Sequence, residues 1–121
     1  MSYNFPINSI VTGGAGFIGS HLVDRLVQRG DRVLVVDDMS TGCYVNVREG
    51  GTILERSVND PKLKQEFEAW NPQVVFHLAA QVSVSQSVRS PELDAQTNIL
   101  GSLNVLRATE DSGCPRLIFA S

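Results

Sequence analysis

The stretch Thr12-Gly13-Gly14-Ala15-Gly16-Phe17-Ile18-Gly19 decides the fold of this chain, because it joins a predicted strand to a predicted helix. Gly13 permits a tight turn, Gly16 leaves room for a pyrophosphate to approach the backbone, and Gly19 lets the helix lie close to the sheet. The amides of the first helical turn would then bind the phosphates. In this context the motif predicts a dinucleotide site, and the alternative is a loop with a structural role alone.

Short apolar runs alternate with stretches of helical period along the rest of the chain. Strands are predicted over residues 7–12, 32–37, 52–55, 74–78 and 116–120, and helices over 17–29, 60–71 and 90–113. This alternation is typical of an α/β fold with right-handed crossovers. We therefore predict a Rossmann-type doubly wound parallel sheet with helices on both faces, and the strand order 3-2-1-4-5 is favoured.

The longest predicted helix, residues 90–113, is expected to turn four leucines toward the core: Leu93, Leu100, Leu103 and Leu106. Gly101 lies inside it and costs about 1 kcal/mol relative to alanine. That glycine therefore indicates either close packing or the approach of a ligand.

Asp37 ends the second predicted strand, where a carboxylate can accept hydrogen bonds from both hydroxyls of an adenosine ribose. The same carboxylate would repel a 2′-phosphate, and the next arginine downstream is Arg48. These features favour NAD over NADP. The alternative interpretation of Asp37 is a turn residue at the end of the strand. Asp38 could share the ribose-binding role or take it over.

The composition is that of a globular protein of 121 residues, with 42% apolar residues, 19% charged residues and a formal net charge of -3. No basic stripe favours nucleic acid as a partner, and no apolar run approaches the roughly 18 residues that cross a bilayer. The segment 1–6 does not have the pattern of a signal peptide. Cys43 and Cys114 have no metal-ligand spacing, so free thiols in a reducing cytoplasm are expected and no metal site is predicted.

Several blocks of the chain resemble, in the same order, the extended short-chain dehydrogenase/reductases: residues 12–21, 36–42, 77–84, 98–102 and 117–121. Together they are most similar to NAD-dependent sugar-nucleotide epimerases and dehydratases, and within these to UDP-glucose 4-epimerases. The resemblance implies that residues 1–121 are an NAD-binding Rossmann domain truncated after its fifth strand. The domain that binds the nucleotide-sugar substrate would be absent.

The resemblance also implies a reaction for the whole parent enzyme. Hydride passes from sugar C4 to NAD, and the resulting 4-keto sugar turns over and takes the hydride back on its other face. A tyrosine of a Tyr-x-x-x-Lys motif acts as the acid and base, and intact members often form dimers. A non-catalytic dinucleotide-binding module and a truncated gene product without activity are the alternatives for this chain.

Carried over position by position, the expected cofactor-binding residues are Gly13, Gly16, Phe17, Ile18, Gly19, Asp37, Asp38, Ser57, Val58, Leu78, Ala79, Ala80 and Asn98. Residues 13–19 would face the pyrophosphate, and residues 78–80 would line the cofactor crevice. Asn98 would reach toward the cofactor from the long helix.

Two departures from the family pattern change these expectations. Arg56-Ser57 stands where the family commonly has Gly-Asp, whose aspartate contacts the adenine amino group. Ser57 can still accept a hydrogen bond, but the loss of charge could cost on the order of 1 kcal/mol. Val58 could pack on the adenine or on the core.

The second departure is the absence of a catalytic pair from these 121 residues. The only tyrosines are Tyr3 and Tyr44, and no Tyr-x-x-x-Lys occurs. Ser121 matches the residue just before the family's catalytic serine or threonine. His77 at the end of a strand is interpreted as a packed, hydrogen-bonded residue rather than a general base. No catalytic residue is therefore assigned.

Overall fold

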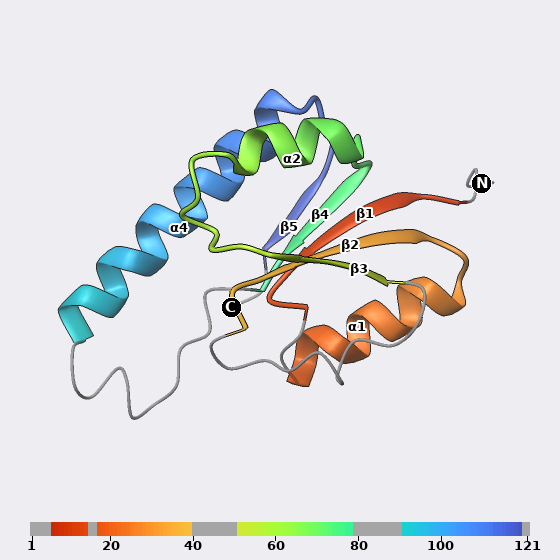
Figure 1. The fold of residues 1–121 in the computed structure, drawn as a ribbon, viewed down its shortest axis with the longest axis horizontal. Helices are drawn as coiled ribbons and strands as arrows, with labels where there is room; N and C mark the ends of the chain where they lie inside the picture. The colour runs from red at the N-terminus through yellow and green to blue at the C-terminus, as the bar shows by residue number, and fades with distance from the viewer. Residues whose placement is uncertain (1–5, 15–16, 40–50, 79–90, 120–121) are drawn as a thin grey trace.

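The computed structural model describes residues 6–14, 17–39, 51–78 and 91–119. Its elements follow one another as an alternation of strands and helices (Figure 1). They are β1 (Asn8–Thr12), α1 (Phe17–Gln28), β2 (Arg32–Asp37), β3 (Gly51–Glu55), α2 (Leu63–Trp70), β4 (Val74–His77), α4 (Pro91–Asp111) and β5 (Leu117–Phe119).

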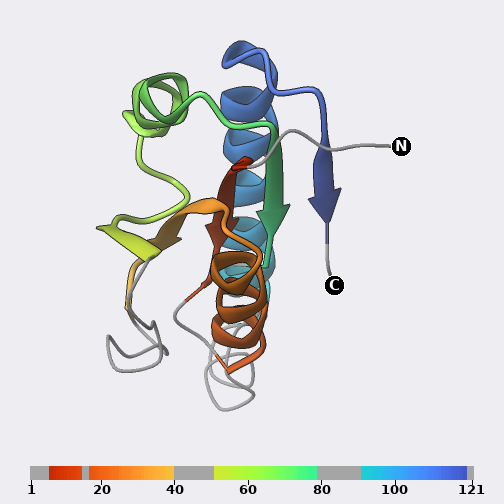
Figure 2. The ribbon, with the colours of Figure 1, turned by 90° about the vertical axis from the view of Figure 1, so that its right-hand side faces the viewer.

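The five strands form one sheet in the order β3-β2-β1-β4-β5, and every neighbouring pair is parallel. Figure 2 shows β3 and β5 at its opposite edges. The predicted α/β class, the doubly wound parallel sheet and the strand order are confirmed. Because β1 is parallel to both β2 and β4, the carboxyl ends of these three strands lie at the same end of the sheet, which we call its carboxyl edge.

Helices cover both faces of the sheet, with α1 on one face and α2 and α4 on the other (Figure 1). Neighbouring positions of each strand serve opposite faces. Ile10 packs with Phe67 of α2 and Val105 of α4, whereas Val11 packs with Val23 of α1. All five side chains are at most 1% exposed. This two-sided burial explains the continuous apolar runs of the strands.

The helix predicted to open at Asp60 begins instead at Leu63. Asp60 still directs its start, since its Oδ1 accepts the N–H of Lys62 at 2.8 Å and its backbone carbonyl accepts the N–H of Leu63 at 3.1 Å. A turn stabilised by the aspartate therefore precedes the first helical turn.

The orientation predicted for α4 is wrong. Leu100, Leu103 and Leu106 are 52%, 45% and 47% exposed, whereas Val105 is fully buried and Ala108 is 1% exposed. The side chain of Leu93 lies outside the described residues. The helix approaches the sheet and α2 so closely that its small residues face inward, and the large side chains take the opposite face.

Within the described ranges, no helix combines the length and apolar character that crossing a bilayer requires. Cys114 carries a free thiol there, and Cys43 lies outside the described residues. Burial raises the pKa of the Cys114 thiol, and Sγ of Cys114 donates to the Arg116 carbonyl at 3.3 Å.

Candidate functional site

The glycine turn after β1 takes the conformation that its sequence demands. Gly13 has a φ of 74°, in the left-handed region that favours glycine, and its N–H donates to the Val36 carbonyl at 2.8 Å. The tight turn predicted at Gly13 is confirmed. Gly16 lies outside the described residues.

The start of α1 packs directly on this turn. A Cβ added at Gly19 would lie 2.2 Å from the Gly13 carbonyl oxygen and 2.8 Å from the Cα of Gly14. The close approach predicted for Gly19 is therefore present, and it is made to the turn that leaves the sheet. Phe17 begins the helix with its side chain outside the described residues, and Ile18 is 56% exposed beside it.

Gly14 is a second close approach that the sequence reasoning missed. A Cβ there would lie 2.7 Å from Cγ1 of Val35 and 3.2 Å from Cγ2 of Val23. The signal was present as the pair Gly13-Gly14, but Gly14 stands outside the every-third-residue spacing. Three glycines thus bring α1, the turn and β2 together, and the first-turn amides of α1 reach the carboxyl edge of the sheet.

Asp37 and Asp38 differ in their surroundings although they are adjacent. Asp37 ends β2, is 8% exposed, and its Oδ1 accepts the N–H of Met39 at 2.7 Å. Met39 has a φ of 64°, an uncommon conformation for a residue with a side chain. Asp38 is exposed. Asp37 therefore supplies a buried carboxylate at the carboxyl edge of the sheet, whereas the Asp38 side chain is exposed to solvent.

His77 connects the ends of two strands to α4. Its Nδ1 lies 2.6 Å from Oγ1 of Thr12, and its Nε2 lies 3.0 Å from Oγ of Ser102. Oγ1 of Thr12 also accepts the N–H of Leu78 at 3.0 Å. His77 is 1% exposed, and this burial lowers its pKa from 6.5, so the neutral imidazole is favoured. The interpretation of His77 as a packed, hydrogen-bonded residue is confirmed. Thr12 and Ser102 are partners that the sequence did not reveal.

The remaining candidates lie on both sides of this edge. Ser57 is exposed after β3, and Val58 is half-buried and packs against the core shared by α2 and α4. Leu78 is 7% exposed and packs in the core on the α1 side. Asn98 is half-buried on α4. Ala79 and Ala80 lie outside the described residues.

The register of the sheet places three of the candidates at the same end of neighbouring strands. Thr12 pairs with Val36 and with His77, and Asp37 pairs with Glu55. Gly13 follows β1, Asp37 ends β2 and Ser57 lies two residues after β3, so these three residues lie at the same edge of the sheet. Such an edge, with a helix N-terminus at its centre and a carboxylate beside it, suits a ligand that carries phosphates and a ribose.

A model of the NAD dependent epimerase/dehydratase family matches residues 9–121. The chain belongs to this family. The family assignment agrees with the glycine turn, the aspartate at the end of β2 and the order of the strands.

The chain is 36% identical to the UDP-glucose 4-epimerase of Mycolicibacterium smegmatis over 120 residues. This alignment covers 95% of this chain and 38% of that relative. Two solved structures are also similar. The UDP-glucose 4-epimerase of Thermotoga maritima with UDP-glucose superposes with a TM-score of 0.89 at 46% identity, over 95% of this chain and 38% of that one. That of Thermus thermophilus in complex with NAD gives a TM-score of 0.85 at 44% identity, over 93% and 37%.

The chain therefore spans between a third and two fifths of the length of these relatives. The superposed part covers nearly all of this chain, and it therefore shows the same fold in the two solved structures.

Proposed function

We propose that this chain binds NAD at the carboxyl edge of its sheet and is the NAD-binding portion, residues 1–121, of a nucleotide-sugar epimerase or dehydratase. The observation that carries the proposal is the packing of Gly19 against the backbone of Gly13 and Gly14, where any Cβ would collide. In this proposal the packing brings the first-turn amides of α1 to the edge of the sheet at which β2 ends with Asp37. Membership in the family and the similar epimerase crystallised with NAD support the same ligand.

The residues at the edge fit the parts of NAD in turn. The amides at the start of α1 would hold the pyrophosphate, and Asp37 would accept hydrogen bonds from the adenosine ribose. Ser57 and Val58 follow the neighbouring strand and would meet the adenine. Asn98 and residues 78–80 would lie on the side toward the nicotinamide ribose.

Bound NAD supplies a hydride acceptor and donor, which in the parent reaction would act at C4 of a nucleotide-sugar through a 4-keto sugar. The 121 residues contain no Tyr-x-x-x-Lys to move the accompanying proton. We therefore expect NAD binding without epimerisation of UDP-glucose by this chain alone. Turnover by the purified chain would contradict that expectation, and binding without turnover also fits a non-catalytic dinucleotide-binding module.

Asp37→Asn tests the proposal with Asp38→Asn as its matched control. The asparagine side chain of D37N would keep an acceptor for the Met39 amide but lose the charge-assisted bonds to the ribose. We expect the Kd for NAD to rise about tenfold in D37N and to change by less than about twofold in D38N. The preference for NAD over NADP should narrow in D37N alone.

Titration calorimetry with NAD and NADP measures these constants. No NAD binding by the wild-type chain would refute the proposed function. A weaker affinity in D38N than in D37N would assign the ribose to Asp38.

We also propose that the chain forms a homodimer through the outward face of α4. Ile99, Leu103 and Leu106 lie along that face at helical spacing and are 61%, 45% and 47% exposed. A helix face that large and apolar suits an isologous contact with a second copy. Sedimentation at increasing concentration tests this, and a monomer throughout would contradict it.

We also propose a cytoplasmic location for the chain. The free thiol of Cys114 supports it, because thiols stay reduced in that compartment. Cell fractionation tests it, and recovery of the protein from an oxidising compartment would contradict it.

A further inference from the structure

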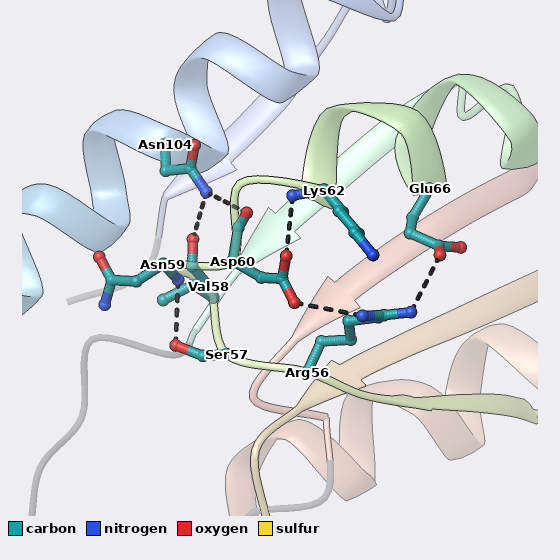
Figure 3. A network of polar contacts seen from close by, with 8 residues as sticks. All are labelled: Arg56, Ser57, Val58, Asn59, Asp60, Lys62, Glu66 and Asn104. Carbon is teal, nitrogen blue, oxygen red and sulfur yellow. Dashed lines mark hydrogen bonds and ion pairs between the residues drawn. The ribbon is translucent and has the colours of Figure 1, made fainter.

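One side chain of α4 holds the segment that follows β3. Nδ2 of Asn104 donates to the carbonyl of Val58 at 2.6 Å and to the carbonyl of Asp60 at 3.0 Å (Figure 3). These carbonyls belong to residues 56–60, which we call the 56–60 loop. Because both hydrogens of one amide are used, the path of the backbone between Val58 and Asp60 is fixed relative to the helix.

Gly101 adds a second contact one helical turn before Asn104. A Cβ at this position would lie 2.7 Å from Cγ2 of Val58, so the absence of a side chain allows α4 to pack on the loop. Positions three apart share one side of a helix. Gly101 therefore sets the distance between helix and loop, and Asn104 sets their register.

The opposite side of the 56–60 loop is anchored by charge. The guanidinium of Arg56 contacts Oδ2 of Asp60 at 3.2 Å and Oε1 of Glu66 in α2 at 3.5 Å. The N–H of Lys62 and the charge of Arg56 lower the pKa of Asp60, with the amide as the larger cause. In Figure 3 these contacts lie on the far side of the loop from Asn104.

The loop also lies next to the carboxylate assigned to the ribose. The N–H of Arg56 donates to the carbonyl of Asp37 at 3.0 Å, across the β2–β3 pair. A base attached to a ribose at Asp37 would therefore meet Ser57 and Val58. Oγ of Ser57 accepts the N–H of Asn59 at 3.1 Å, which orients this hydroxyl within the loop.

We propose that Asn104 is a positioning residue for adenine recognition: by holding the 56–60 loop to α4, it determines where Ser57 and Val58 meet the base. The proposal rests on the proposed function, since it concerns the adenine end of the same NAD site. Asn104 acts through the loop and does not itself touch the base.

Asn104→Ala tests this role, and Arg107→Ala is the control because it truncates an exposed side chain of the same helix to the same residue. Each chain is titrated with NAD and with nicotinamide hypoxanthine dinucleotide, in which a keto oxygen replaces the adenine amino group. We expect N104A to raise the Kd for NAD about tenfold and that for the hypoxanthine analogue less than about threefold. R107A should change both by less than about twofold.

The ratio of the two constants separates positioning from a general structural role. A smaller ratio of the Kd for the hypoxanthine analogue to the Kd for NAD in N104A than in the wild-type chain supports the proposal. An equal loss of affinity for both ligands overturns it. If N104A does not fold, the same ratio is measured on Asn104→Gln, which keeps the donor but displaces it by one methylene. An unchanged ratio in that variant also overturns the role. No NAD binding by the wild-type chain refutes the proposed function itself, whereas wild-type binding with an unchanged ratio in N104A refutes only the role of Asn104.

Discussion

The two faces of helix α4 differ in the size of their residues as well as in their burial. The inward face carries Gly101, Val105 and Ala108, which pack against the sheet, α2 and the 56–60 loop. The outward face carries Leu103 and Leu106, which are nearly half exposed. Residue size on the inward face is limited by how closely the helix must approach the sheet. Hydrophobicity alone therefore does not identify the buried side of this helix.

The largest expected effect comes from placing the same charge on each face. Val105 is fully buried and Leu106 is 47% exposed, although they are neighbours. Val105→Lys buries an ammonium group without a partner, so we expect the free energy of unfolding to fall by at least about 3 kcal/mol. Leu106→Lys should change it by less than about 0.5 kcal/mol.

Urea denaturation of the two variants measures this difference. L106K should also weaken self-association in sedimentation, since it places a charge on the proposed contact face. Similar losses of stability in V105K and L106K would show that the two faces are not distinct.

Much of the fold follows from the sequence because the deciding signals are local. The strands were predicted within a residue or two by their apolar runs, and the turn at Gly13 by the glycine spacing. Right-handed crossovers then restrict the order of the strands.

The inward face of α4 could not be found in the same way. Its buried residues are small or polar, whereas the four leucines of its sequence form the more conspicuous apolar pattern. Which face is covered depends on how near the sheet and the 56–60 loop lie, and the loop is contributed by residues some forty positions away in the chain.

The candidate site shows the same division. Gly13, Gly19 and Asp37 belong to a motif with fixed local spacing, so they could be named in advance. Thr12 and Ser102 contact His77 across 65 and 25 positions, and no local pattern reveals such partners.

A smaller effect is expected from filling the space at Gly101. Gly101→Ala places a Cβ 2.7 Å from Cγ2 of Val58, and we expect a loss of about 1–2 kcal/mol in the free energy of unfolding. Val58→Ala removes the obstructing methyl groups. In that background the same change should be neutral or stabilising, because alanine is favoured over glycine in a helix by about 1 kcal/mol.

The four chains of this double-mutant cycle are compared by urea denaturation. A coupling energy near zero would show that α4 does not depend on close approach to Val58. The inward face would then be defined by hydrophobicity after all.

The smallest expected effect is a change in how steeply the free energy of unfolding depends on pH. This dependence tests how completely water is excluded from the surroundings of His77. Burial lowers the pKa of His77 from 6.5, so His77 takes up a proton more readily in the unfolded chain than in the folded chain. Its titration therefore does not change the free energy of unfolding above about pH 6.5, and it reduces that free energy as the pH falls below this value. His77→Asn removes this titration, and the free energy of unfolding should then depend less steeply on pH between 6.5 and 5.

Comparing slopes rather than absolute values cancels the effect of the hydrogen bonds that the variant loses at every pH. Equal slopes in H77N and wild type would mean that water reaches the imidazole beneath α4, and the contrast between the two faces of the helix would weaken at the point where it meets the strands.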